Sequence, residues 1–427
     1  MIAAPAESES DLGQRLMTRL DRLARFSSDA DQLTRLYLTP EHKAAALQVQ
    51  AWTAEAGMDA SIDATGNVVG RYPGEASQET ALLLGSHLDT VRNAGKYDGA
   101  LGVLAAIAAV DELNRAEERL PFALEVIAFG DEEGVRFPVT LTGSRAVAGT
   151  FDPAALDAED AEGISLREAL QRFGCDPLQV PGLRHRPETV LGYIEVQIEQ
   201  GPVLEAEDLS LGVVTAINGA SRFDLDVAGE AGHAGTVPMR LRKDALAAAA
   251  EMVLAIERRA SATPDLVATV GRLAALPGAV NVIPGTVRLT LDIRAPADAV
   301  RAAAVHDLEQ ELAGIAARRA VRLEISGTYD VPAATCAPQL IGQLEDAVAR
   351  AGIRPLRLPS GAGHDALAMA DLCPVGMLFV RCKGGISHNP AESVTMEDAG
   401  TVVRVLLDFL RHFEPAGAVR HRDAFVP

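Results

Sequence analysis

The sequence predicts an α/β protein with a mixed, largely parallel sheet flanked by helices, and this domain is interrupted by a smaller second unit. Short apolar runs alternate with helical segments through Thr150, which is typical of a parallel sheet. Strands and helices then follow the order βαββαβ, the ferredoxin-like pattern, between residues 217 and 328. The chain has 427 residues, enough for two domains with their own cores. We therefore expect segments 1–216, 217–328 and 329–427, with the first and third forming one domain.

The N-terminal segment predicts two helices and a strand region. Leucines recur at helical spacing from Asp11 to Phe26, which indicates an amphipathic helix. A second helix is predicted from Pro40 to Gly57, with Thr39 as its N-cap and proline at the first helical position. A strand pattern with two glycines follows from Ala60 to Tyr72.

A histidine and two aspartates follow the first strongly apolar run. Residues 81–84 predict a buried strand, so His87 and Asp89 are expected just past its end, the edge at which open α/β sheets bind ligands. Asp98 precedes an Ala-rich segment that predicts a helix, and is an N-cap candidate. Imidazole with carboxylate suits zinc, manganese or cobalt, but a loop histidine and a helix cap explain these residues equally well.

Three adjacent acids favour the metal interpretation. The apolar run 121–130 predicts another strand and leads directly into Asp131, Glu132 and Glu133. Neighbouring carboxylates repel one another unless they share a cation or a proton. A solvated acidic turn is the alternative, and it leaves unexplained why two strands both end in histidine, aspartate or glutamate side chains.

The middle of the chain combines a surface excursion with one regular strand. Acids, glycine and proline dominate residues 151–187, where only one short helix is predicted, near 165–173. The strand from Gly192 to Gln200 alternates cleanly, so one set of side chains shares a polar face. These are Tyr193, Glu195, Gln197 and Glu199.

The second unit carries three polar residues at its strand ends and loops. Its predicted elements are strand 222–228, helix 242–258, strands 266–273 and 286–294, helix 297–317 and strand 321–326. His233 lies in a Gly-rich turn, Asn281 in a loop between strands, and Arg294 at a strand end. Taken alone, they indicate only a surface histidine, a turn asparagine and a solvated arginine.

The last segment returns to the first domain. Residues 360–366 form a Gly-rich loop that opens a helix, and its backbone N–H groups could receive an anionic or carbonyl group. His364 and Asp365 lie in this loop, where they could support the residues that bind the metal, although a helix cap explains Asp365 equally well. A strand is predicted at 375–381, then a loop with His388, and a closing helix at 392–413.

Composition excludes several classes of partner. A net charge of −20 argues against a nucleic-acid or anionic membrane surface. The N-terminus lacks the apolar core of a signal peptide, and no apolar run is long enough to span a membrane. The cysteines lack metal or disulfide spacing, so we expect buried, reduced thiols and a cytoplasmic enzyme of small molecules. These are Cys175, Cys336, Cys373 and Cys382.

The motifs resemble those of a known family. They are SHLDT and YDG at 86–99, DEEGVRF at 131–137, IEQGPVLE at 198–205, GHAGTVPM at 232–239, NVIPG at 281–285, DIR at 292–294, GAGHDA at 361–366 and SHNPAE at 387–392. Together they resemble the amidase, hydantoinase and carbamoylase branch of the M20 metallohydrolases, which includes allantoate amidohydrolases and N-carbamoyl-L-amino acid hydrolases. The match runs from about residue 60 to 400 in the family's order, which is far more specific than one motif.

The resemblance implies a divalent metal, with one or two ions per subunit. Zinc or manganese is expected, with cobalt or nickel as alternatives. Asp98 would bridge the ions, with His87 on one side and Glu133 and His388 on the other. Glu132 would act as general base, and Asp89 would hold His87 in its metal-binding tautomer.

The resemblance also implies how substrate is held. Arg294 and Asn281 would bind its carboxylate, and His233, from the partner subunit of a homodimer, would donate to the oxyanion. Gln200 would meet a ureido group, and Gly363 with His364 would complete the pocket. The second unit is a lid and dimerisation domain in this family.

Gln197 departs from the family pattern, in which a histidine of the motif HIEQG binds one of the metals. An amide oxygen is a neutral, weak ligand, so the metal near His87 should be held less tightly. The site could bind two ions with Gln197 as a poor ligand, run on one ion held by Asp98, Glu133 and His388, or be inactive.

The expected substrate is therefore an amide or ureido compound with a carboxylate. We expect allantoate, cleaved to ureidoglycine, ammonia and carbon dioxide, and keep N-carbamoyl-L-amino acids as the rival. An aminoacylase or dipeptidase of the broader family fits the GAGHDA and IEQGPVLE motifs less well. A metal-poor binding or assembly protein is the remaining alternative, because of Gln197.

Overall fold

The computed structural model describes residues 8–75 and 80–415 and divides into two compact units. The first comprises Met1–Thr215, Cys336–Leu358 and His364–Pro427, and the second comprises Ala216–Thr335 with Pro359–Gly363. The domain boundary expected after residue 328 falls inside the last strand of the second unit, β13 (Arg322–Val331).

The larger sheet is parallel at its centre and antiparallel at its edges, as expected for this α/β fold. Its strand order is β1-β2-β4-β3-β5-β16-β6-β14, with β15 beside β6, and the pairs β3–β4, β3–β5 and β5–β16 are parallel. The strands are β1 (Asp59–Ile62), β2 (Val68–Tyr72), β3 (Ala81–His87), β4 (Ala123–Phe129), β5 (Val190–Ile198), β6 (Leu211–Ile217), β14 (Ala334–Thr335), β15 (Arg357–Ser360) and β16 (Val375–Val380). The central strands β3 and β4 are buried along their whole length, which explains their continuous apolar sequence.

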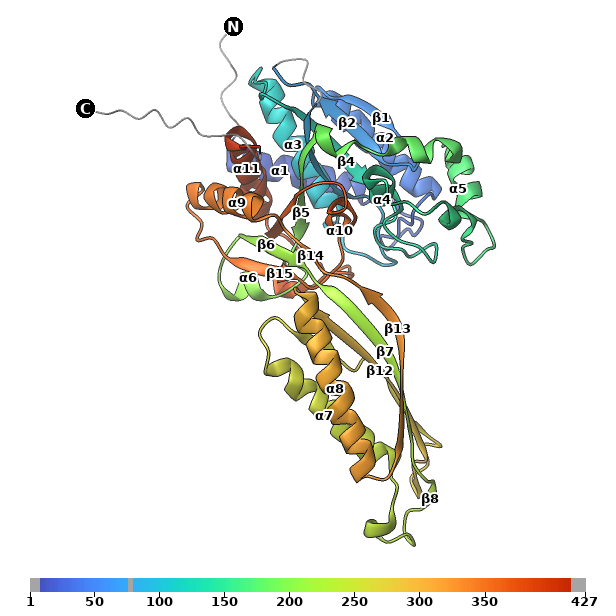
Figure 1. Cartoon of the computed structure of the whole chain (residues 1–427). Coiled ribbons are helices and arrows are strands. Elements are labelled where there is room, and N and C mark those ends of the chain that lie inside the picture. The colour runs from blue at the N-terminus through green and yellow to red at the C-terminus, as the bar shows by residue number, and fades with distance from the viewer. Residues whose placement is uncertain (1–7, 76–79, 416–427) are drawn as a thin grey trace, which may run out of the picture. The chain divides into compact units, whose positions relative to one another are not determined.

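Helices cover this sheet. α1 (Glu9–Leu23), α3 (Ala100–Arg115) and α11 (Met396–His412) pack against one another, and α3 also packs on β3 and β5 (Figure 1). The close approach of α3 depends on Gly102, where an added Cβ would lie 2.0 Å from the Val196 carbonyl oxygen. The other helices of this unit are α2 (Pro40–Glu55), α4 (Thr142–Ala148), α5 (Leu166–Phe173), α6 (Val203–Ala206), α9 (Pro338–Arg350) and α10 (Asp365–Met369). Thr39 caps α2, as its sequence predicts, by accepting from the His42 amide.

The second unit has the expected ferredoxin-like βαββαβ order with one modification. Its antiparallel sheet has the order β10-β12-β7-β13, and β9 also pairs with β12. The elements are β7 (Gly219–Ala228), α7 (Ala245–Ser261), β9 (Val267–Thr269), β10 (Leu273–Leu276), β12 (Thr286–Ala295), α8 (Asp298–Arg318) and β13. The single strand predicted at 266–273 is thus two short strands. α7 and α8 lie side by side and share one apolar core with the sheet (Figure 1).

Three sequence predictions about element ends are wrong. His87 is the last residue of β3 rather than a residue beyond it. Gly99, not Asp98, is the N-cap of α3, because the Asp98 carboxylate faces two histidines instead of the helix amides. The closing helix begins at Met396 with Thr395 as its cap, so Glu392 lies in the preceding loop.

Several features of the surface and composition also bear on function. Residues 151–187 form α5 and short 3₁₀ turns, including one at Pro153–Asp157. All four cysteines are free thiols, three of them buried.

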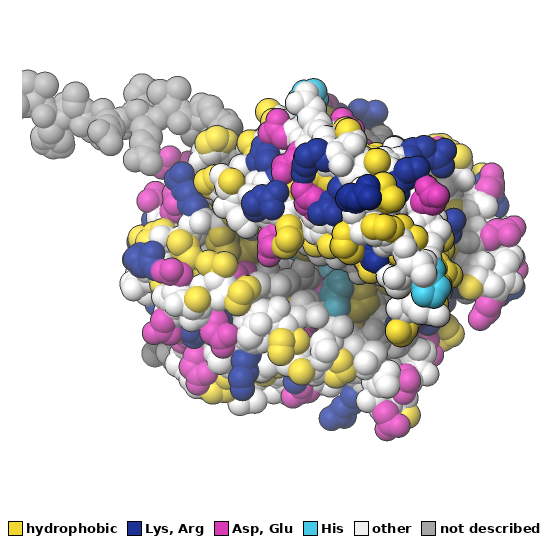
Figure 2. Space-filling model, turned by 90° about the horizontal axis from the view of Figure 1, so that it is seen from below, with side chains coloured by type: hydrophobic (Ala, Val, Ile, Leu, Met, Phe, Trp, Pro, Cys, Tyr) yellow, Lys and Arg dark blue, Asp and Glu magenta, His cyan; other side chains and the backbone are white. Residues whose placement is uncertain are grey.

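No described helix is long and apolar enough to cross a membrane. Figure 2 shows acidic and basic side chains interspersed over the visible face, so the net negative charge forms no single acidic patch there.

Candidate metal centre

The parallel pairing of β3 with β4 brings a histidine next to the acids that follow β4. His87, the end of β3, lies opposite Phe129, the end of β4. The Leu88 amide donates to the Phe129 carbonyl at 2.8 Å, which continues the pairing into the loops. The acids of the next turn therefore reach the His87 ring.

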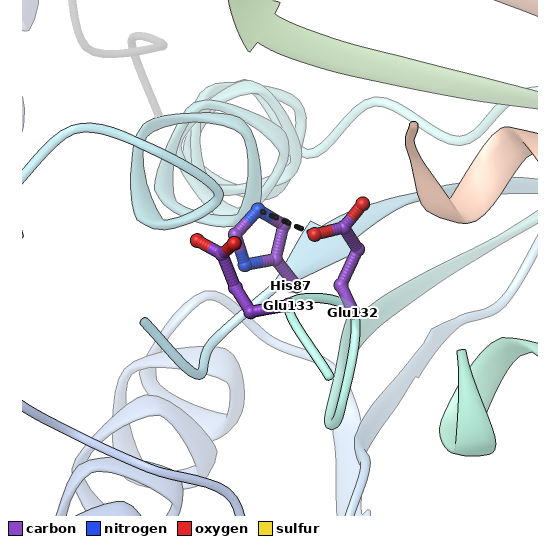
Figure 3. A group of neighbouring side chains, drawn as sticks. All are labelled: His87, Glu132 and Glu133. Atoms are coloured by element: carbon purple, nitrogen blue, oxygen red, sulfur yellow. Dashed lines mark ion pairs between the residues drawn. The ribbon is translucent and has the colours of Figure 1, made fainter. Parts of the chain in front are cut away.

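Only two of the three adjacent acids face this ring. Glu132 and Glu133 both place their carboxylates close to the His87 imidazole (Figure 3). Asp131 points elsewhere, because its backbone has φ 71° and its buried carboxylate accepts from the Thr142 hydroxyl. A backbone in this left-handed region is uncommon for a residue other than glycine.

Asp98 lies between two histidines. His87 Nε2 is 3.5 Å from Asp98 Oδ1, and His388 Nε2 is 3.3 Å from Asp98 Oδ2. His87 Nε2 is also 3.9 Å from Glu132 Oε2, and His388 Nε2 is 3.5 Å from Glu133 Oε2. The structure thus forms two ligand groups, His87 with Glu132 and Glu133, and Asp98 with Glu133 and His388, each with its ligand atoms within 4.8 Å of one another.

The centre concentrates buried negative charge. Burial raises the pKa of Glu132 well above its usual range, and repulsion from Glu133 adds to this effect. Burial and the Asp98 charge raise the pKa of Glu133 to about 7. Burial alone would raise the pKa of Asp98, but the nearby His388 and His87 rings lower it strongly. Burial would likewise lower the pKa of His87, but the surrounding acids raise it well above its ordinary value.

These residues fit a divalent cation. Asp98 Oδ1 is buried and has no hydrogen-bond partner among the described residues, an arrangement that is costly unless something positive lies beside it. Carboxylates with imidazole are a donor set suited to zinc or manganese. A cation would also relieve the repulsion among the acids.

Asp89 supports the centre differently from the expectation that its side chain orients His87. The Asp89 carboxylate accepts from the amides of Glu132 and Glu133 at 3.2 and 3.3 Å, so it holds the acidic turn. Its backbone carbonyl lies 3.0 Å from His87 Nδ1. Because a carbonyl only accepts, Nδ1 carries a proton and Nε2 faces the acids.

Gln197 is completely buried beside His87. Its side-chain oxygen accepts from the Gly99 and Ile198 amides, each at 3.2 Å. Its Nε2 lies 3.0 Å from His87 Nε2. The residue therefore contacts His87 at the atom that faces the acids.

Gln200 and Glu392 hold Asp98 in place. Gln200 Nε2 donates to Asp98 Oδ2 at 2.8 Å, from a backbone with φ 57°. Glu392 accepts from the Tyr97 and Asp98 amides at 2.8 and 3.1 Å and from the Ser387 hydroxyl at 3.2 Å. It thereby ties the Asp98 loop to the loop that carries His388. Sequence reasoning missed this role of Glu392, although an acid four residues after His388 in a Pro-containing loop was an available signal.

A second layer of buried polar groups lies behind His87. Glu195 accepts from the Ser86 hydroxyl at 3.0 Å and from the Ala366 amide at 2.8 Å, and burial raises its pKa to about 7. Burial lowers the pKa of His364 to about 3, so its ring is neutral. The charge of Asp98 raises this pKa and that of His87 lowers it, but burial has the larger effect. Asp365 begins α10, and burial and the Glu195 charge raise its pKa well above its usual range. Gly363 precedes His364 directly but belongs to the second unit.

The other expected substrate residues lie within the second unit. The exposed His233 is in β8 (Gly232–His233), which pairs with β11 (Val282–Ile283), and the Ala234 amide donates to the Asn281 carbonyl at 2.9 Å. His233 and Asn281 are therefore neighbours. Arg294 is half-buried and donates to both carboxylate oxygens of Asp292, at 2.8 and 3.1 Å, and to the Gly361 carbonyl at 2.7 Å.

Comparison with known proteins assigns the family. The profile of the family described as peptidase family M20/M25/M40 matches residues 83–412. The chain is 42% identical over 395 residues to the N-carbamoyl-L-amino acid amidohydrolase of Geobacillus stearothermophilus, covering 92% of this chain and 97% of that protein. It is 41% identical over 427 residues to the allantoate deiminase of Arabidopsis thaliana, covering 92% of this chain and 81% of that protein.

A solved structure shows the same fold over nearly the whole chain. It is an amidase of the hydantoinase/carbamoylase family from Burkholderia multivorans, with a TM-score of 0.89 and 33% identity, covering 94% of this chain and 98% of that one. Membership in this group implies a divalent metal, which the donor set around Asp98 fits. The chain therefore belongs to the M20 family, in its hydantoinase/carbamoylase branch, and is an amidohydrolase.

Proposed function

We propose that this protein hydrolyses the ureido C–N bond of allantoate at a centre that holds one or two divalent cations. The protein is an amidohydrolase of C–N bonds other than peptide bonds. The observation that carries the proposal is the meeting of two histidines and three carboxylates, among them buried Asp98, whose Oδ1 accepts no hydrogen bond from the described residues.

The side chains of the centre have two roles in this proposal, which are to hold the cation and to transfer a proton. When bound, a divalent cation supplies a Lewis acid and makes a nearby water more acidic. His87, Asp98, Glu133 and His388 would hold it. Glu132 accepts the proton of the attacking water and delivers it to the leaving nitrogen, as the C–N bond breaks. Its half-buried carboxylate lies beside His87, and its backbone amide donates to Asp89, which holds this turn in place.

The substrate class follows from what the two relatives have in common. One is named for N-carbamoyl-L-amino acids and the other for allantoate, and both compounds carry a ureido group and a carboxylate. We assign the carboxylate to Arg294 and Asn281, with Gln200, Gly363 and His364 nearer the ureido group. After its bonds to Asp292 and Gly361, Arg294 retains one N–H on each terminal nitrogen, and these two can receive a carboxylate end-on.

N-carbamoyl-L-amino acid hydrolysis is the second candidate, favoured by a relative of equal similarity. The two substrates differ in the group that replaces the amino-acid side chain, which is a second ureido group in allantoate. The choice between them therefore depends on the residues that meet this group.

A homodimer formed through the second unit is part of the proposal, with His233 of the partner subunit as donor to the oxyanion. Large apolar side chains are exposed along the edge strands and the following loop of this unit, an arrangement that favours association with a second copy. They are Val267, Leu273, Leu276 and Val280.

A substrate panel tests the assignment. The protein is loaded with Mn²⁺, and ammonia and amino-acid release are measured with allantoate, several N-carbamoyl-L-amino acids and N-acetyl-amino acids. The proposal expects the highest kcat/KM with allantoate and ammonia as a product. A higher kcat/KM with a carbamoyl amino acid would select the second candidate, and turnover of the acetyl compounds alone would refute both.

A further inference from the structure

The orientation of the Gln197 amide is fixed by its neighbours. Its side-chain oxygen receives two backbone N–H groups, from Gly99 and Ile198, each at 3.2 Å. Because an N–H can only donate, the oxygen rather than the nitrogen of the amide must occupy this position. The NH₂ group is therefore the part that faces His87, with Nε2 3.0 Å from His87 Nε2.

The His87 ring is also fixed in orientation. Its Nδ1 lies 3.0 Å from the Asp89 carbonyl and carries the proton. A metal ion can bind His87 only when Nε2 carries a lone pair, and in that form of the ring the Gln197 NH₂ group donates to Nε2. A metal ion would need this same lone pair.

On the His388 side of the centre, no described residue donates a hydrogen bond to the histidine in this way. The described neighbours of His388 Nε2 are carboxylate oxygens of Asp98 and Glu133, at 3.3 and 3.5 Å. An ion that binds there lies between mutually repelling carboxylates and breaks no hydrogen bond of this kind. An ion that binds at His87 must in addition break the bond from Gln197.

We infer that Gln197 divides the centre into two unequal positions. One ion is held tightly by Asp98, Glu133 and His388, while a second binds weakly at His87 because the Gln197 amide competes for its lone pair. Loss of a buried hydrogen bond of ordinary strength weakens binding about two- to tenfold. The missing fourth ligand adds to this, so the second ion should bind at least about tenfold more weakly than the first.

This inference rests on the proposed function only in requiring that the centre binds divalent cations. Metal-free protein is titrated calorimetrically with Mn²⁺ and with Zn²⁺, and the ions that remain after gel filtration are counted by mass spectrometry. The unmodified protein should give two binding steps and retain one ion per chain.

Two variants test whether the NH₂ group of Gln197, and not another part of this side chain, weakens the binding of the second ion. Gln197→Glu keeps an oxygen for the Gly99 and Ile198 amides but replaces the NH₂ group by an acceptor, and Gln197→His supplies a neutral ligand. Both should tighten the second step at least about tenfold and retain two ions. Gln50→Glu is the control for added charge, since Gln50 is a half-buried residue in α2 whose amide donates to the Ala60 carbonyl at 3.1 Å. It should leave both steps unchanged.

A spectroscopic measurement on the unmodified protein does not depend on the folding of any variant. Nitrogen-15 spectra are recorded on histidine-labelled protein that carries one Zn²⁺ per chain, with the His87 signals assigned by their loss in His87→Gln. The inference expects Nδ1 to be protonated and the Nε2 signal to show no zinc coordination.

The outcomes distinguish this inference from the proposed function. Two ions of equal affinity in the unmodified protein, an unchanged second step in both Gln197 variants, or zinc on His87 Nε2 with one ion bound would overturn the inference alone. Failure of the unmodified protein to bind any divalent cation would overturn the proposed function as well.

Discussion

At the scale of single residues, function depends on how one carboxylate is surrounded. Asp98 has one oxygen with two hydrogen-bond donors, Gln200 and Ser387, and one buried oxygen without any among the described residues. This asymmetry leaves an acceptor for a cation while the rest of the side chain is held in place. The neighbouring carboxylates of Glu132 and Glu133 would share such a cation.

Glu132 is the proposed general base, so replacing its carboxylate should remove turnover and leave the cation in place. Glu132→Gln is expected to lower kcat by about 10²- to 10⁴-fold, since this is the usual contribution of a positioned base. The measurement is ammonia release, with bound metal counted in the same samples. Undiminished kcat in a metal-loaded variant would exclude Glu132 as the base.

Glu392 joins the loop of Asp98 to the loop of His388, so its replacement tests whether it positions these ligands. Glu392→Ala removes the acceptor of the Tyr97 and Asp98 amides, and metal affinity should fall about 10- to 100-fold. Glu397→Ala, at an exposed site in the first turn of α11, is the control and should bind metal normally. Equal metal affinity in the two variants would show that Glu392 has no part in the centre.

At the scale of elements, the centre depends on how closely α3 lies on the sheet. Gly102 permits this approach, since a Cβ there would meet the Val196 carbonyl oxygen and the Ser86 side chain. Gly102→Ala is expected to lower the free energy of unfolding by about 1–3 kcal/mol through overpacking, despite the higher helix propensity of alanine.

The matched control for this variant is Gly342→Ala in α9, where a Cβ meets nothing within 4 Å. That change should raise the free energy of unfolding by about 0.5–1 kcal/mol. Urea unfolding of both variants measures the difference. If Gly102→Ala were as stable as Gly342→Ala, α3 would not be held at the described distance from β5.

A partly buried ion pair between His185 and Glu125 of β4 makes stability depend on pH. His185 Nε2 lies 2.6 Å from Glu125 Oε1. Burial lowers the pKa of His185, but the hydrogen bond to Glu125 outweighs this and leaves it raised above 6.5. Burial raises the pKa of Glu125, and its bond to His185 outweighs this in turn, so it ends below 4.5.

The sign of the pH effect follows from these shifts. A raised histidine pKa gives stability that is complete below pH 6.5 and lost as the pH rises through the folded-state value. The lowered Glu125 pKa gives stability that is present above pH 4.5 and lost on further acidification. His185→Gln should therefore cost more unfolding free energy at pH 6 than at pH 9, as measured by urea unfolding at about those pH values. A cost that is equal at both, or greater at pH 9, would contradict the assigned pair.

Much of this level of structure was predictable from sequence, because local chemistry decides it. Thr39 before Pro40 predicts a helix start, and the apolar runs of β3 and β4 predict buried strands. The end of β3 at His87 and the cap of α3 at Gly99 were not predictable, because tertiary contacts decide them. The same holds for Asp131, which is adjacent to Glu132 in sequence but is turned away by its backbone.

At the scale of the whole molecule, the M20 fold explains why ligands far apart in sequence meet. His87, Asp98, Glu133 and His388 come from loops and strand ends separated by up to about 300 residues, and the central parallel strands bring these ends to one edge of the sheet. The pairing of Gln197 with His87 could not be predicted, since it depends on the register of β5 beside β3. The assignment of His233, Asn281 and Arg294 in the second unit to the substrate was predicted only from family resemblance.

The most direct test of the account is an anomalous difference map from crystals of the protein loaded with Zn²⁺. The account predicts a peak about 2.0–2.2 Å from ligand atoms of Asp98, Glu133 and His388. A peak bound elsewhere, or none at these three residues in zinc-loaded crystals, would contradict the claim that this cluster is a metal centre.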